Sequence, residues 1–229
     1  MNTITITIDG GSGVGKGTIS KLISAKLGLQ LIDSGAMYRT ISYLLFSNSI
    51  SIEAVTQELL QSITFLYKDS ILHVKYYEEE HIVEKLPIRT QENSQNSSKY
   101  AVIPILREHI TNQIRTIMSQ GGYVLEGRDA GSVIYPQAQV KFYIECPIEV
   151  RAKRRLEDYK REEGILYTQE EVIQELEERD FRDKNRDTDP LIVPKNAYII
   201  SNDDSKSLNQ RVEEMILIIR YTQDKLEKN

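Results

Sequence analysis

The chain has 229 residues, of which 28% are charged, and a formal net charge of −5. This acidic balance argues against nucleic-acid and anionic-membrane partners, which require a surplus of lysine and arginine. The single cysteine, Cys146, excludes an internal disulfide and a cysteine-clustered zinc site, and its apolar surroundings indicate a core residue rather than a nucleophile. Because the sequence shows neither a signal pattern nor a membrane-length apolar run, we expect a cytoplasmic monomer.

The first predicted elements are a strand, a glycine-rich loop and a helix. A β-branched run predicts a strand over 3–8, and apolar residues at helical spacing predict a helix over 16–27. In this context, successive backbone N–H groups cradle phosphate oxygens, and a lysine at the helix start reaches the outer phosphates. The segment therefore predicts binding of a nucleoside triphosphate. The predicted phosphate loop comprises Gly10, Gly11, Ser12, Gly13, Val14, Gly15, Lys16, Gly17 and Thr18.

The following segments alternate between strand and helix patterns, which predicts an α/β fold with a parallel sheet and helices on both faces. Further strands are predicted at 29–32, 122–126, 140–146 and 197–201, and helices at 36–46, 104–119, 148–163, 168–185 and 208–226. Gly28 is expected to end the first helix, and Thr168 and Ser207 each begin a capping-box pattern. Alternation of threonine and isoleucine over 3–7 is unusual for a central parallel strand, although threonine can be buried.

Residues 63–88 interrupt the alternation. Short β patterns at 63–67, 71–76 and 81–84 predict a small antiparallel meander inserted between the second and third core strands. Periodicity alone leaves open whether this insertion binds substrate or is a surface decoration. The polar stretch 91–98 is interpreted as a loop.

Two arginine-containing helices carry further candidate residues. On one, Val172 and Leu176 share a helical face with Arg179, Asp183 and Arg186, so these charges should point inward toward a ligand. An internal salt-bridge network is the alternative.

The other helix carries Arg151, Arg154 and Arg155 at i, i+3 and i+4. We interpret the charged segment 160–167 as a mobile lid that excludes water, with Arg151 and Arg155 reaching the transferred phosphoryl group. The alternative is a solvated basic helix face.

Five motifs together resemble the bacterial cytidylate kinase family along nearly the whole chain. They are Gly-Lys-Gly-Thr at 15–18, Asp-Ser-Gly-Ala-Met-Tyr-Arg at 33–39, Ile-Arg-Thr-Gln at 88–91, Gly-Arg-Asp at 127–129 and the charged run at 178–186. The resemblance implies transfer of the γ-phosphoryl group of ATP to CMP or dCMP with Mg²⁺. It also implies a five-stranded parallel P-loop core over about 1–33, 102–150 and 188–229. The monophosphate-binding region would be 34–101, with the meander at 62–88, and the short helical lid 151–187.

The resemblance also implies residue roles. Charge neutralisation during transfer falls to Lys16, Arg128, Arg179 and Arg186, together with Arg151 and Arg155 of the lid. CMP binding falls to Ser34, Arg39, Ser98, Arg107, Arg128, Asp129, Arg179, Asp183 and Arg186. An aspartate suits cytosine because it accepts a hydrogen bond from the 4-amino group, whereas uracil presents an oxygen there.

Two positions depart from the family pattern. Glu126 stands where the family usually has aspartate, and Gly11 stands where proline is common. Thr18 and Glu126 are candidates to hold Mg²⁺, directly or through water. Two other functions stay open: a kinase for another small acceptor such as UMP, AMP or shikimate, and a nucleotide-dependent switch that hydrolyses ATP without an acceptor.

Overall fold

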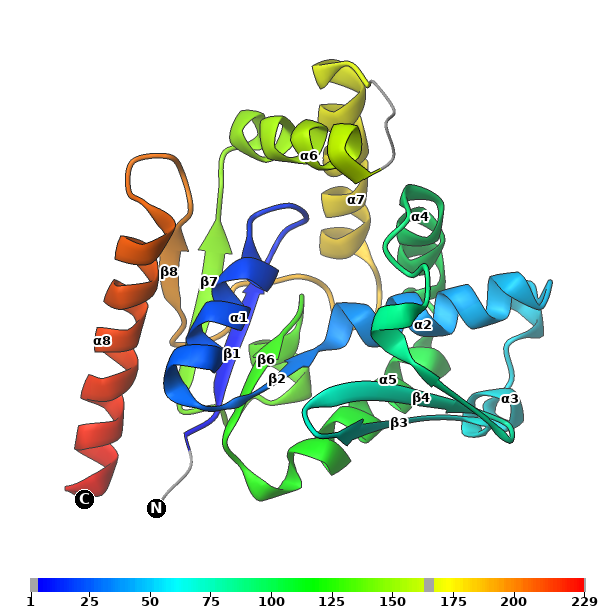
Figure 1. Cartoon of the computed structure of the whole chain (residues 1–229), viewed down its shortest axis with the longest axis horizontal. Coiled ribbons are helices and arrows are strands. Elements are labelled where there is room, and N and C mark those ends of the chain that lie inside the picture. The colour runs from blue at the N-terminus through cyan, green and yellow to red at the C-terminus, as the bar shows by residue number, and fades with distance from the viewer. Residues whose placement is uncertain (1–3, 163–166, 229) are drawn as a thin grey trace. The chain divides into compact units, whose positions relative to one another are not determined.

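The structure, a computed structural model, describes residues 4–162 and 167–228. Contacts divide the chain into two compact units. The core unit comprises residues 1–31 and 122–229, and the inserted unit comprises residues 32–121. Each unit has its own architecture, and Figure 1 gives the element labels.

The main sheet has five strands in the order β2-β6-β1-β7-β8. Their bounds are β1 Ile6–Gly10, β2 Gln30–Asp33, β6 Tyr123–Glu126, β7 Val140–Glu145 and β8 Tyr198–Ser201. In the parallel ladders, Ile6 lies opposite both Val124 and Val140, and Phe142 lies opposite Tyr198. This confirms the predicted parallel sheet, and it places the carboxyl ends of β1, β6 and β7 at one edge, where ligands bind in open α/β sheets.

Helices α1 (Lys16–Leu27) and α8 (Leu208–Glu227) pack against the sheet in one apolar cluster (Figure 1). The predicted caps are confirmed: Gly28 ends α1 in the left-handed conformation, and both capping boxes are formed. The other core-unit helices are α6 (Ile148–Glu162), α7 (Gln169–Asn185) and the π-helix η4 (Ala130–Ile134). Residues 163–166 of the predicted lid lie outside the described residues.

The alternation of threonine and isoleucine in and before β1 has a structural reason. Ile6 and Ile8 belong to the apolar cluster with α1 and α8. Thr5, Thr7 and Asp9 are buried as well, at 2%, 0% and 0% exposure. Both sides of the central strand are therefore buried, as in other parallel sheets, but one side is polar.

The inserted unit contains the predicted meander. Strands β3 (Ile63–Lys68), β4 (Ile71–Tyr76) and β5 (Glu79–Ile82) form an antiparallel sheet in that order. The third strand starts two residues earlier than predicted, and residues 83–85 form a 3₁₀ turn instead. The helical elements of this unit are α2 Ser34–Ser47, η1 Ile52–Ala54, α3 Gln57–Gln61, η2 Val83–Lys85, α4 Gln91–Tyr100, α5 Pro104–Ile117 and η3 Met118–Gln120.

The prediction of a loop over 91–98 is wrong, because these residues form most of α4. The Thr90 side chain caps the helix by accepting a hydrogen bond from the Asn93 N–H at 3.2 Å. The helix was missed because its inward face is polar. Its buried residues are Asn93, Ser94, Ser97, Ser98 and Tyr100. Asn93 connects neighbouring segments by donating from Nδ2 to the carbonyl oxygens of Arg39 and Ile88, each at 2.9 Å.

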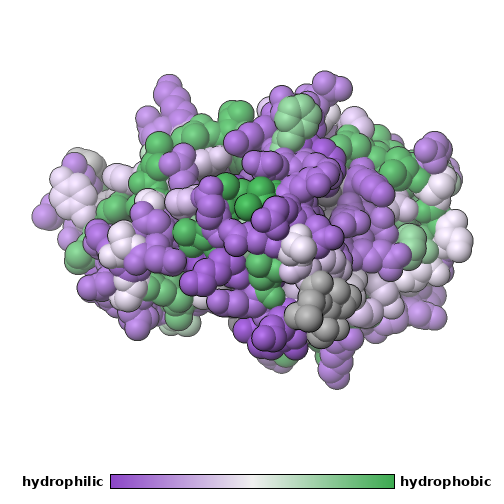
Figure 2. Space-filling model, turned by 90° about the horizontal axis from the view of Figure 1, so that it is seen from above, coloured by the Kyte–Doolittle hydropathy of each residue, from purple (hydrophilic) through white to green (hydrophobic). Residues whose placement is uncertain are grey.

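The surface is mainly hydrophilic, and Figure 2 shows separate small apolar areas on the face that it presents. No described helix is long and apolar enough to cross a membrane.

Candidate active site

The phosphate loop joins β1 to α1 and depends on backbone conformations that favour glycine. Gly13 and Gly15 have φ values of +70° and +91°. Gly15 also directly precedes α1, and a Cβ atom there would clash with the side-chain amide of Asn202. The loop therefore leads into the amino end of a twelve-residue helix, a natural site for anions.

Lys16 lies inside this loop. Its side chain donates from Nζ to the Gly11 carbonyl oxygen at 2.6 Å, and the residue is 4% exposed. Burial lowers the pKa of Lys16, and the guanidinium groups of Arg128 and Arg179 lower it further. Several cations thus share a confined space, an arrangement that a bound anion would stabilise.

Asp180 and Arg151 hold the backbone of Ser12 in the phosphate loop. The sequence did not predict these contacts. Asp180 Oδ1 accepts a hydrogen bond from the Ser12 N–H at 2.8 Å. Arg151 Nη1 donates both to the Ser12 carbonyl oxygen, at 2.8 Å, and to Asp180 Oδ2, at 2.6 Å. The Asp180 carboxylate also lies so close to Gly11 that a Cβ there would be 3.0 Å from its oxygens. Asp180 could have been found from its place between Arg179 and Asp183 on the predicted inward face.

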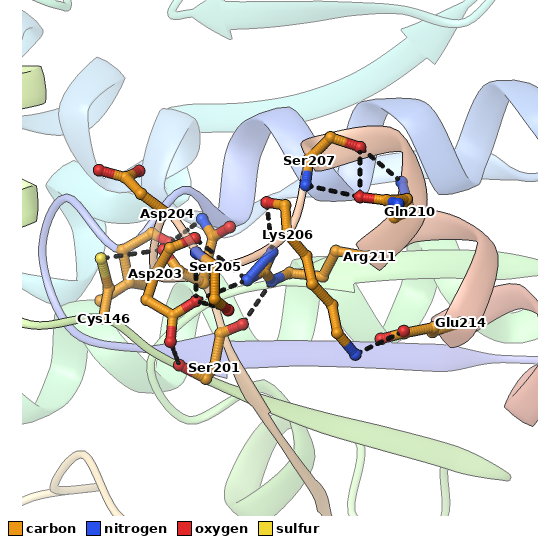
Figure 3. A network of polar contacts seen from close by, with 12 residues as sticks. Cys146, Ser201, Asp203, Asp204, Ser205, Lys206, Ser207, Gln210, Arg211 and Glu214 are labelled. Carbon is orange, nitrogen blue, oxygen red and sulfur yellow. Dashed lines mark hydrogen bonds and ion pairs between the residues drawn. The ribbon is translucent and has the colours of Figure 1, made fainter.

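The end of β8 supports the loop from the other side. Asn202 donates from Nδ2 to the Val14 carbonyl oxygen at 2.7 Å, and its own carbonyl oxygen accepts from the Cys146 thiol at 3.1 Å. The following turn is organised around Arg211, which is 2% exposed and bonds the backbone of Ser201 and Asp203 (Figure 3). Burial raises the pKa of Cys146, in keeping with the predicted structural role.

The predicted inward face of α7 is confirmed. Val172, Leu176 and Asp183 are buried, at 1%, 2% and 6% exposure. Asp183 accepts a hydrogen bond from Arg128 Nε at 2.9 Å and lies 3.8 Å from Arg186 Nη1.

Arg186 Nη2 in turn lies 3.6 Å from Asp129 Oδ1. Burial acts to raise the pKa of Asp183, but Arg128, Arg179 and Arg186 outweigh it and lower the value. The ion-pair network considered as the alternative is therefore present on the same inward face.

The two candidate metal-binding residues lie at the start of α1 and the end of β6. A Cβ on Gly17 would lie 3.5 Å from Glu126 Oε2, so this carboxylate stands beside the phosphate loop. Thr18 is exposed on the first turn of α1. A carboxylate beside a phosphate site suits Mg²⁺, which commonly binds one or two carboxylates, substrate phosphates and water.

The inserted unit holds a second charged cluster at the start of α2. Asp33 caps this helix by accepting from the Ala36 N–H at 2.8 Å, and its other oxygen lies 3.4 Å from Arg39 and 3.2 Å from Arg89. A Cβ on Gly35 would be 3.1 Å from Arg39 Nη1, so glycine gives the guanidinium room. Arg89, 62% exposed at its side chain, is a further candidate outside the predicted site, although it lies in the Ile-Arg-Thr-Gln motif at 88–91.

Three other predicted residues in this unit are buried. Ser34, Ser98 and Arg107 are 3%, 5% and 1% exposed. Arg107 donates to the Ala101 carbonyl oxygen at 3.1 Å, and its guanidinium carbon lies 5.4 Å from the centroid of the Tyr38 ring.

The two other candidate arginines of α6, Arg154 and Arg155, have different surroundings. Arg155 lies over the Tyr159 ring, 4.5 Å from its centroid. Arg154 donates to the Asn202 carbonyl oxygen at 3.1 Å and to Asp204 at 2.8 Å. Among the described contacts of Arg151, Arg154 and Arg155, a hydrogen bond to the phosphate loop is made by Arg151.

Comparisons with known proteins agree with this geometry. The family model described as cytidylate kinase matches residues 6–221. A cytidylate kinase of Fervidobacterium nodosum is 37% identical over 220 residues, covering 94% of this chain and 95% of that protein. Cytidylate kinases of Pasteurella multocida and Pseudothermotoga lettingae are 35% and 33% identical, covering 99% and 100% of this chain and 98% and 99% of theirs. The chain therefore belongs to the cytidylate kinase family.

Proposed function

We propose that this protein transfers the γ-phosphoryl group of ATP to CMP or dCMP, giving ADP and CDP or dCDP. The observation that carries the proposal is the cluster of the buried Lys16 with the half-buried Arg128 and Arg179 beside a glycine loop, in a chain of this family. Phosphoryl transfer needs positioning and neutralisation of charge more than it needs a general base, and these residues provide both.

On the donor side, we propose that the backbone N–H groups of residues 10–18 and the Lys16 ammonium bind the ATP phosphates. Arg151 is already held against the Ser12 carbonyl, where it can contribute charge at the loop. Arg155 keeps its proposed role in transfer, although in this structure it stacks on Tyr159.

On the acceptor side, we propose that Arg128, Asp129, Arg179, Asp183 and Arg186 of the core unit bind CMP. Ser34, Arg39, Ser98 and Arg107 of the inserted unit have the same proposed role. Asp129 would accept a hydrogen bond from the cytosine 4-amino group. Arg39 would offer its guanidinium to the monophosphate in bidentate geometry.

The residues present fit a magnesium ion. Glu126 and Thr18 would hold it directly or through water, next to the phosphate loop. When bound with ATP, Mg²⁺ supplies positive charge to the β- and γ-phosphate oxygens. We also propose a cytoplasmic monomer without nucleic-acid or membrane partners. The net charge of −5 supports the absence of nucleic-acid and anionic-membrane partners.

The test is release of ADP from MgATP with CMP, dCMP, UMP, AMP, GMP and shikimate offered one at a time. Turnover strongest with CMP or dCMP, and low without an acceptor, is the expected result. Strong turnover with another acceptor would keep the kinase and overturn the proposed base contacts. Hydrolysis independent of any acceptor would favour the nucleotide-dependent switch instead.

A further inference from the structure

Asp9 is a completely buried carboxylate that the proposed reaction does not use. It stands near the end of β1, with 0% exposure. Its Oδ1 accepts a hydrogen bond from the Ala130 N–H at 2.7 Å, and its Oδ2 accepts from the Gly131 N–H at 2.8 Å. Hydrogen bonds to an ionised group are the strong class, so two of them hold this backbone firmly.

The backbone that Asp9 holds directly follows Asp129. The Asp129 carbonyl oxygen accepts from the N–H groups of Val133 and Ile134 at 2.9 and 3.0 Å, in the first turn of η4. Asp129 is thus fixed through its own carbonyl and through the two peptides after it. Its side chain is 2% exposed and reaches within 3.6 Å of Arg186.

The fit between η4 and β1 leaves little space. A Cβ on Gly131 would lie 2.5 Å from Thr7 Oγ1 and 3.1 Å from Asp9 Oδ2. Thr7 and Asp9 share the polar side of β1, the side that does not join the apolar cluster. Among the described residues, the Thr7 hydroxyl has no hydrogen-bond partner, so Thr7 supports the segment by shape and Asp9 supports it by charge.

We propose that Asp9 is a positioning residue for acceptor recognition, which fixes the Asp129 carboxylate by holding the two peptide N–H groups that follow it. Asp9 does not touch the base and acts through Asp129. The inference rests on the proposed role of Asp129 in reading cytosine. It gives the polar side of β1 a purpose: the strand that leads into the donor's phosphate loop also anchors the segment that selects the acceptor.

Protonation provides an independent readout. Burial raises the pKa of Asp9 to about 7. The hydrogen bonds from the Ala130 and Gly131 N–H groups lower this pKa, but their effect is smaller than that of burial. The titratable groups that interact with it are Lys16 of α1, Asp129 itself and Tyr143 of β7. Below that pH the carboxyl loses the charge that strengthens both bonds, so selection of CMP over UMP should weaken as the pH falls.

The experiment measures kcat/KM for CMP and for UMP across roughly pH 6–8.5, a range that spans the pKa of Asp9. The ratio of the two cancels the titration of the phosphate that both acceptors carry, whose second pKa is about 6. The variants are Asp9→Asn, which turns one acceptor into a donor facing an N–H, and Gly131→Ala, which pushes η4 from β1. Thr7→Val, of equal shape, is the matched control.

We expect both test variants to lower the CMP-to-UMP ratio about tenfold, a loss typical of one misplaced buried hydrogen bond, with little change in the KM for ATP. In the parent and in Thr7→Val, the CMP-to-UMP ratio of kcat/KM should decrease as the pH is lowered through about 7. In Asp9→Asn, the ratio should be independent of pH. If Asp9→Asn does not fold, Gly131→Ala and the parent's pH profile decide.

A parental ratio in both variants would overturn the inference. So would an equal loss of CMP, UMP and ATP use, because that pattern means general support of the fold. A parent enzyme that does not prefer CMP over UMP would instead overturn the proposed role of Asp129, before any variant is compared.

Discussion

At the scale of single residues, the candidate site brings several cations together with the carboxylates that pair with them. Asp183 pairs with Arg128 and Arg186, and Asp180 pairs with Arg151. Lys16 lies among Arg128 and Arg179, and its lowered pKa reflects their repulsion in addition to burial. Binding of polyphosphate would relieve that repulsion, so the residues should matter more for transfer than for folding.

Replacing Lys16 by alanine should reduce kcat for CMP by about 10²–10³-fold or more, the loss expected when one donor to a transition-state charge is removed. The fold should persist, since the hydrogen bond of this ammonium in the structure is to the neighbouring Gly11 carbonyl. Steady-state kinetics and thermal melting measure the two effects. Lys21→Ala, on the exposed side of α1, is the control, and near-parental turnover in Lys16→Ala would contradict the phosphate-loop assignment.

Replacing Asp129 by alanine should raise the KM for CMP at least tenfold while changing the KM for ATP much less, because an unpaired buried polar group costs about 1–3 kcal/mol. The KM for each substrate, measured with the other saturating, checks this. Asp224→Ala, an exposed change on α8, should leave both values as they are. Equal losses for CMP and ATP would exclude a role of Asp129 in base recognition.

At the scale of elements, the sequence predicts best where local chemistry decides the structure. Helix α1 has the predicted bounds because a glycine in the left-handed conformation flanks each end, Gly15 before it and Gly28 after it. The inward face of α7 was predictable because Val172 and Leu176 continue into Asp183 at helical spacing. Helix α4 was not predictable, because its buried face is made of serine and asparagine, so hydrophobic periodicity is missing.

The contacts between distant segments were also beyond the sequence. Nothing local indicates that Asn202 supports Val14 or that Asp9 holds Gly131, because the members of these pairs are 188 and 122 residues apart along the chain. Arg89 and Asp180 stood in recognised motifs, yet their partners, Asp33 and the Ser12 N–H, are defined only by the folded structure.

The phosphate loop, taken as an element, makes its own prediction. Gly15→Ala should raise the KM for ATP about tenfold or more, because the residue has φ +91° and a Cβ would clash with Asn202. The strain would move the N–H groups that cradle phosphate. The KM for ATP is obtained from initial rates at varied ATP concentration with CMP saturating. Ser24→Ala within the same helix keeps the loop glycines and is the control; an unchanged KM in Gly15→Ala would show that the loop tolerates the side chain.

At the scale of the whole molecule, the buried carboxylate of Asp9 should affect folding stability in a defined direction. Its pKa rises from 3.8 to about 7 on folding, so between these values the folded state binds more protons than the unfolded state. Stability contributed by this group is therefore present at low pH and lost as the pH rises through about 7.

Compared with Asp9→Asn, which does not titrate, the parent should lose about 2–3 kcal/mol of unfolding free energy between roughly pH 5 and 8. Urea denaturation of both proteins at the two pH values measures the difference. A gap between parent and variant that stays constant with pH would contradict the raised pKa. The carboxyl of Asp183 acts in the opposite sense, because its pKa is lowered, and it cancels in the comparison.

The hydrogen bond from Asn202 to Val14 also bears on how the protein is made. The phosphate loop is synthesised before Arg151, Asp180 and Asn202, the residues that hold its backbone. At roughly 5–20 residues per second, the nearly 190 residues between Val14 and Asn202 take on the order of 10–40 seconds to add. A nascent chain therefore carries the glycine-rich loop for that time before Asn202 is present to hold the Val14 carbonyl.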